Sequence, residues 1–231
     1  MLIHNYIIKV FFFLGAVLLA TQVIATETSN IKEYGIVILL EDKCTKKAQE
    51  LNRRIGEILD KLKNVDNHLH VTLYHGASNL KDLAQIYRKI QQLSLKPFTL
   101  NLDKIYSTAD RWIDLGIEKT DYLQKIHNHV VAIASPYHKR PLARSSDAYQ
   151  DVTDVQRRQI DDYGVGNVLE FYNPHMTLFY QYPPNAELRE AIISIRPYCT
   201  LMVCKASKIV IGELGYNGNI KKIIYSVDIP D

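Results

Sequence analysis

The stretches HLHVTLYHG at 68–76 and NPHMTLFYQY at 173–182 share one short pattern, His-x-Thr-Leu-aromatic. The first copy contains His70 and Thr72, the second contains His175 and Thr177, and the histidines are 105 positions apart (175 − 70). A histidine with Thr at +2 and Leu at +3 should arise by chance only ~0.04 times in such a chain, so two copies indicate a duplication. A duplicated chain is expected to fold into two related halves.

The elements expected around the two copies follow the same order in both halves. Each half reads strand, helix, His-Thr strand, helix, strand, judged from the spacing of apolar residues. The last two strands form a hairpin across Asn217-Gly218, and an insertion at 135–168 precedes the second motif. The expected helices cover 44–64, 79–94, 121–134 and 185–198, and the expected strands cover 34–41, 68–76, 98–107, 111–119, 170–182, 208–216 and 220–229.

This repeated order predicts an α+β fold with two pseudo-symmetric lobes, each an antiparallel sheet with flanking helices. The lobes are expected at about 34–107 and 111–229, intertwined in a single domain, because no Gly/Ser/Pro-rich linker separates them. A functional site is expected in the cleft between the lobes. The net charge of +3 does not favour stable binding of duplex DNA.

The first 25 residues are expected to form a signal peptide rather than part of the fold. Lys9 precedes an apolar run at 10–20, and Val23 and Ala25 are the small residues of a cleavage site. The apolar run is shorter than the roughly 20 residues that a membrane span needs. We therefore predict cleavage after Ala25, a mature domain at 26–231 that is not attached to a membrane, and a secreted or periplasmic protein. An uncleaved membrane anchor is the alternative.

Three cysteines follow the predicted cleavage site, at positions 44, 199 and 204. An odd number cannot pair completely within one chain, so a disulfide framework is not indicated. Cys199 and Cys204 are close in sequence and are one candidate pair, which leaves Cys44 free. No Cys-x-x-Cys pattern points to a structural zinc site.

The two motif strands carry groups suited to phosphodiester hydrolysis. Because side chains alternate along a strand, each motif places an imidazole and a hydroxyl on one face, about 6–7 Å apart. One neutral histidine can take a proton from water while a protonated one gives a proton to the leaving oxygen. The threonine hydroxyls are expected to donate to the non-bridging phosphate oxygens, so no metal or other cofactor is required. The expected motif faces are His70, Thr72 and Tyr74 in one strand and His175, Thr177 and Phe179 in the other.

The segments HVTL at 70–73 and HMTL at 175–178 resemble the signature of the 2H phosphoesterase superfamily, which includes LigT-like 2′-5′ RNA ligases and cyclic nucleotide phosphodiesterases. The resemblance extends over roughly 34–229. It implies metal-independent hydrolysis by the two motifs, acting on a nucleotide or short RNA with a 2′,3′-cyclic phosphate or a 2′-5′ linkage. The predicted signal peptide departs from most relatives, which are intracellular RNA-processing enzymes, and it favours scavenging or attack on extracellular or foreign nucleotides.

Five further residues are candidates for substrate binding. Several members of the superfamily have an aromatic residue after the second motif that contacts substrate, and Tyr180 occupies such a position. Strict alternation points Tyr180 to the core, so only a bulge would bring it to the site. Tyr34 and Trp112 open the leading strands of the two halves and are candidates to stack a base, although packing in the aromatic core is the default expectation for both. Arg140 and Arg144 are candidates for a basic rim that holds substrate phosphates, with a solvated loop as the alternative.

Two other functions remain open. One is a non-catalytic nucleotide- or RNA-binding protein of the same fold. The other is a metal-dependent hydrolase in which His68 and His70 are ligands, although no carboxylate lies beside them in the sequence. His127 and His129 are predicted to be ordinary surface residues of a helix. A monomer is expected.

Overall fold

The computed structural model describes residues 31–60, 68–142, 152–181, 183, 185–215 and 217–230. The helices are α2 (Asp42–Ile58), α3 (Leu80–Gln91), α4 (Asp121–Ala134), α6 (Asp154–Tyr163) and α7 (Glu187–Ile195). Short 3₁₀ turns are η1 (Ser135–Tyr137), η2 (Leu169–Phe171) and η3 (Arg196–Tyr198). The strands are β1 (Lys32–Leu40), β2 (Val71–Ser78), β3 (Thr99–Thr108), β4 (Trp112–Ile117), β5 (His175–Tyr180), β6 (Met202–Leu214) and β7 (Ile220–Asp228).

The strand pairings close on themselves. The order is β1-β2-β5-β4-β3-β6-β7, and β1 also pairs with β6. Strand β6 reaches both parts of the sheet, since its first residues pair with β3 and the rest pair with β1. On the other side, one residue pair joins the motif strands β2 and β5, Val71 opposite Met176. The sheet is therefore built as two antiparallel parts that meet along β6 and at the motif strands.

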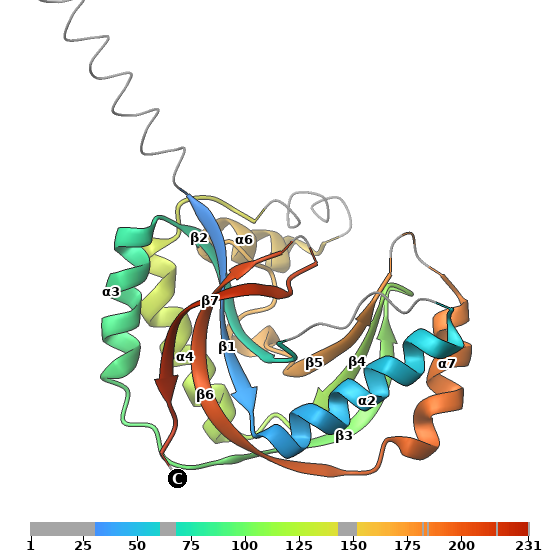
Figure 1. Ribbon diagram of the computed structural model, residues 1–231. Helices are drawn as coiled ribbons and strands as arrows, with labels where there is room; N and C mark the ends of the chain where they lie inside the picture. Colours follow the sequence, from blue (N-terminus) through green and yellow to red (C-terminus); the bar gives the residue numbers. More distant parts are fainter. Residues whose placement is uncertain are drawn as a thin grey trace, which may run out of the picture.

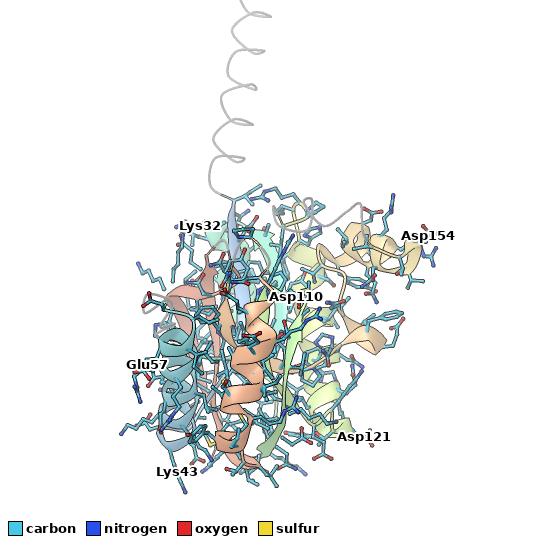
Figure 2. The ribbon with its side chains drawn as sticks, turned by 90° about the vertical axis from the view of Figure 1, so that its right-hand side faces the viewer. Lys32, Lys43, Glu57, Asp110, Asp121 and Asp154 are labelled. Carbon is cyan, nitrogen blue, oxygen red and sulfur yellow. A yellow bond between two sulfur atoms is a disulfide. The ribbon has the colours of Figure 1, made fainter. Side chains whose placement is uncertain are left out.

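The helices are exchanged between the two sequence halves. Helix α2, which follows β1, packs on β5 and α7, whereas α4, which follows β4, packs on β2 and α3. Figure 1 shows α3 and α4 beside β1 and β2, and α2 and α7 beside β3, β4 and β5. Figure 2 shows α2, running from Lys43 to Glu57, alongside α7 on the flank that faces the viewer. The predicted α+β class with two pseudo-symmetric lobes of antiparallel sheet and flanking helices is confirmed.

Most boundaries lie close to their expected positions, and the differences have local causes. Strand β5 starts at His175 rather than near 170, because Pro174 lacks the N–H that would extend the ladder and η2 precedes it. Helix α6 lies in the predicted insertion and was not expected. It begins with a capping box between Thr153 and Gln156 and ends at Gly164, whose φ of 81° favours glycine.

The alternative in which Cys199 pairs with Cys204 is wrong. Cys44 and Cys204 form a disulfide with a Cα–Cα distance of 5.8 Å, and Cys199 is free. Cys204 turns into the core from β6, under the first turn of α2 that carries Cys44, whereas Cys199 lies before β6 begins. The disulfide therefore joins two elements that are 160 positions apart in the sequence.

The predicted signal peptide lies outside the described residues. Within the described part of the chain, no helix is both long enough and apolar enough to span a membrane.

Candidate functional site

The four motif side chains lie on one face of the paired motif strands. His70, Thr72, His175 and Thr177 are half-buried. The residues between them point into the core, with exposed fractions of 1% or less for Val71, Leu73, Met176 and Leu178. The alternation that the sequence predicts through each His-x-Thr segment is therefore present in both strands.

The strand register brings the two motifs together crosswise. Val71 pairs with Met176 in an antiparallel arrangement. Continuing this register by one residue on either side places His70 across from Thr177 and Thr72 across from His175. Directly opposite residues on one face of such a ladder have Cβ atoms roughly 4.5–5.5 Å apart. Each imidazole thus has the hydroxyl of the other motif as its cross-strand neighbour.

Both motif histidines are held in the same orientation. Nδ1 of His70 lies 2.7 Å from the carbonyl oxygen of His68, and Nδ1 of His175 lies 2.8 Å from that of Asn173. Since a carbonyl only accepts, Nδ1 carries the hydrogen in both rings, and Nε2 has the lone pair whenever either ring is neutral. Nε2 is therefore the nitrogen that each ring can offer to a ligand, and His70 and His175 are matched in this respect.

A β-bulge follows the threonine in both motif strands. Ile36 and Val37 of β1 pair with Tyr74 and Thr72, which leaves Leu73 without an opposite residue. In the second half, Ile113 and Asp114 of β4 pair with Phe179 and Thr177, and Leu178 is skipped. Each bulge shifts the alternation by one residue.

The bulges decide which aromatic residues reach the motif face. Tyr74 and Phe179, which were expected there, are buried, with exposed fractions of 1% and 2%. Tyr180 is half-buried and packs against Trp112, with ring centroids 5.3 Å apart. At the matching position of the first half is His75, whose Nε2 lies 3.5 Å from the hydroxyl of Thr72. The bulge that Tyr180 required is therefore present.

Buried polar groups from the exchanged helices hold both bulges. The side-chain amide of Asn52 on α2 donates to the carbonyl of Leu178, and Nδ1 of His127 on α4 donates to that of Leu73, at 2.7 Å. Nε2 of His127 accepts from the backbone N–H of Leu169, at 2.8 Å. The prediction that His127 is a surface residue is wrong, because its side chain is fully buried. Burial lowers the pKa of His127 from its usual 6.5 to about 4, so the ring is neutral at neutral pH.

The two motif threonines differ in what their hydroxyls contact. Thr177 donates to one carboxylate oxygen of Asp114, at 2.8 Å, and Thr108 donates to the other, also at 2.8 Å. Asp114 is buried, with an exposed fraction of 2%. The residue opposite Thr72 in the first half is Val37, which offers no acceptor. Sequence reasoning missed Asp114, although an aspartate within the apolar run WIDLGI at 112–117 is a signal that could have found it.

The remaining candidate residues fall in different places. Trp112 is half-buried beside Tyr180 at the edge of the motif face. Tyr34 does not reach that face, because its side chain is fully buried against Tyr74. Its role as a base-stacking residue is therefore wrong. Arg140 is exposed and forms an ion pair with Glu33 at 3.0 Å, and Arg144 lies outside the described residues.

No cluster of three or more His, Cys, Asp or Glu side chains that could hold a metal ion occurs within the described residues. Nδ1 of His70 faces the backbone of His68 rather than a shared ligand position. Two imidazole and two hydroxyl side chains are the polar groups that the two motifs contribute to this face.

Comparison with known proteins finds likeness at the level of the fold. No protein-family model matches the sequence, and no curated protein is significantly similar to it. A structure described as a phosphoesterase aligns over 87% of this chain and 99% of its own, with 15% identity and a TM-score of 0.50. The structure of TT0787 of Thermus thermophilus aligns over 85% of this chain and 97% of its own, with 12% identity and a TM-score of 0.51. E. coli LigT complexed with 3′-AMP aligns over 87% and 99%, with 14% identity and a TM-score of 0.48. The chain therefore shares its fold with the phosphoesterase structure and with TT0787.

Proposed function

We propose that this protein is a 2H-type phosphodiesterase that hydrolyses 2′,3′-cyclic phosphates or 2′-5′-linked or cyclic oligonucleotides. The observation that carries the proposal is the matched pair of histidines. His70 and His175 are presented by equivalent strands, with Nδ1 of each tied to a backbone carbonyl. A fold shared with a phosphoesterase supports the same conclusion.

In the proposed reaction both rings are held at Nδ1 in the same way, and one ring is neutral while the other is protonated. The neutral histidine takes a proton from water through Nε2, and the resulting hydroxide attacks phosphorus. The protonated histidine gives its Nε2 proton to the oxygen that leaves. An imidazole has a usual pKa of roughly 6.5, so both states are accessible near neutral pH. The side chains themselves supply the acid and the base, so the proposed reaction needs no metal.

The proposed substrate is a nucleotide or a short RNA rather than a duplex. Trp112 and Tyr180 form a tilted aromatic pair beside the motif face, and such a pair can stack a base. A net charge of +3 provides little of the phosphate neutralisation on which duplex binding depends. We expect the protein to act as a monomer.

We propose further that the protein is exported. The disulfide between Cys44 and Cys204 supports an oxidising compartment, because such bonds are rare where cellular thiols are kept reduced. Cleavage after Ala25 would yield a secreted or periplasmic enzyme that begins at Thr26. N-terminal sequencing of exported protein tests this, and a sequence that still starts at Met1 would indicate a membrane anchor instead.

A substrate screen tests the enzymatic proposal. The mature protein is incubated with 2′,3′-cyclic mononucleotides, 2′-5′ oligoadenylates and cyclic dinucleotides, with EDTA present throughout. We expect turnover of at least one class, and we expect it to vanish in the double variant His70→Ala, His175→Ala. Loss of activity in EDTA with recovery on adding zinc or manganese would replace the two-histidine mechanism by a metal-dependent one. Tight binding without turnover would indicate the non-catalytic alternative.

A further inference from the structure

The two motif threonines have opposite hydrogen-bonding roles, and this difference distinguishes the two sides of the site. A threonine hydroxyl has one hydrogen to donate and two lone pairs. Thr177 gives its hydrogen to the carboxylate of Asp114, which accepts only. What Thr177 presents to the motif face is therefore a lone pair, and its partner there must be a donor.

The hydroxyl of Thr72 is not committed in this way. Among the described residues its side-chain partner is Nε2 of His75 at 3.5 Å, the outer limit of a hydrogen bond. Val37 lies opposite it, where Asp114 lies opposite Thr177. Thr72 can therefore give its hydrogen to a phosphate oxygen.

We propose that Thr72 donates to the phosphate, while Thr177, held as an acceptor by Asp114, orients the attacking water. This inference rests on the proposed function. His70 lies opposite Thr177, so a water held by Thr177 loses its other proton to Nε2 of His70. The hydroxide then bonds to phosphorus, the phosphorus–oxygen bond of the leaving group breaks, and that oxygen takes the proton of His175, which lies opposite Thr72. Asp114 is a positioning residue that acts through Thr177.

The first arm of the test is binding of inorganic phosphate, followed by calorimetry. Thr72→Val should weaken phosphate binding roughly tenfold or more, because a hydrogen bond to a charged group is lost. Thr177→Val should change it less than about twofold. Thr72→Ser and Thr177→Ser keep the hydroxyl and serve as matched controls that should bind like the unaltered protein. Equal weakening by the two Val variants would overturn the proposal.

The second arm makes the two halves alike. Asp114→Val places in β4 the residue that β1 has opposite its own threonine, and it releases the hydrogen of Thr177. Phosphate binding should then tighten roughly fivefold, since a second donor becomes available, while kcat for 2′,3′-cyclic AMP falls. Loss of the Asp114 charge alone would also favour an anion, so the control is the double variant Asp114→Val, Thr177→Val, which loses the same charge without gaining a donor. It should bind phosphate more weakly than Asp114→Val does. Unchanged or weaker phosphate binding in a folded Asp114→Val protein would contradict the assigned role of Asp114.

The third arm assigns the two histidines. Bis(p-nitrophenyl) phosphate has a leaving group that needs no proton, so His175→Ala should lose at least tenfold less activity on it than on 2′,3′-cyclic AMP. His70→Ala should lose about equally on both substrates, because water must still be deprotonated. The reverse pattern would contradict the proposal, because it would make His175 the base and His70 the acid. If the unaltered protein hydrolyses neither compound, the proposed function fails, whereas the phosphate titrations still report on the two hydroxyls separately.

Discussion

Strands β2 and β5 have the same arrangement around their histidines and differ in the residues around their threonines. Both present a histidine tied at Nδ1, a half-buried threonine and a bulge whose carbonyl is held by a helix from the other sequence half. Beyond that, β5 has Asp114 behind its threonine and Tyr180 after its bulge, whereas β2 has Val37 and His75. The shared features place the two histidines alike, whereas the unshared features give the two threonine hydroxyls different neighbours.

The largest expected effect tests what the strands share. His70→Ala and His175→Ala should each lower kcat by roughly 10²–10⁴, the usual contribution of a positioned acid or base. The double variant should be little worse than either single one, because the two groups act as a unit. Steady-state kinetics on the best substrate of the screen measures this. Near-full activity in either single variant would mean that the reaction does not need both histidines.

The next effect concerns how each exchanged helix is attached to the sheet. At the first turn of α2 the attachment is the Cys44–Cys204 disulfide, whereas near the start of α4 Tyr122 packs edge-on against Phe98. Cys204→Ser should lower the free energy of unfolding by about 2–5 kcal/mol, because the closed loop is long. Urea titration measures the loss. Cys199→Ser is the control and should leave the midpoint unchanged.

A somewhat smaller effect distinguishes His127 from Asn52, the two residues that hold the bulges, by the pH dependence of stability. His127 has a folded-state pKa of about 4 against a usual 6.5, so the unfolded chain binds more protons between these values. The neutral His127 ring contributes about 3 kcal/mol to stability above pH 6.5, and this contribution is lost as the pH falls towards 4.

The matched variant is His127→Asn, which copies the amide that Asn52 uses on α2. It should flatten the stability profile between pH 4 and 6.5 in denaturant titrations repeated at each pH. A profile as steep as that of the unaltered protein would mean that another group titrates there.

The smallest effect concerns the residues that follow the bulges. Tyr180→Ala should raise KM for a nucleotide substrate roughly tenfold, since stacking of one base contributes about 1–3 kcal/mol. Tyr180→Phe keeps the ring and should stay near the original KM. His75→Ala should change KM less than about threefold, because its imidazole is only 9% exposed and offers a base little surface. An equal rise in KM for His75→Ala would mean that the base lies on the first half instead.

The order of helices and strands could be predicted because the duplicated motif and the spacing of apolar residues both indicate the same order. Helix α6 was missed although its start carries a Thr153-x-x-Gln156 capping box. His127 was misplaced although it lies four residues after Leu123 and three before Val130, on the apolar side of its helix. In both cases the sequence next to the residue carries a signal for the observed structure.

Other features have no local signal. The bulges at Leu73 and Leu178 follow no glycine, and they are held by groups more than fifty positions away, namely His127 and Asn52. The exchange of α2 and α4 between the halves concerns how the helices pack, and it leaves the order of elements along the chain unchanged. Tyr34 is a candidate from the sequence because it opens the first strand, but its place in the strand does not tell which face the helices cover.

The exchanged helices also bear on how such a site can arise. Two separate copies of one half, each covering the motif strand of the other with its helix, would form a symmetric dimer with the histidines beside its twofold axis. A symmetric dimer must carry the same residue at both equivalent positions, so it could have two valines or two aspartates there, but never one of each. Joining the copies in a single chain removes that restriction, and Val37 and Asp114 are a difference that only the joined chain can hold.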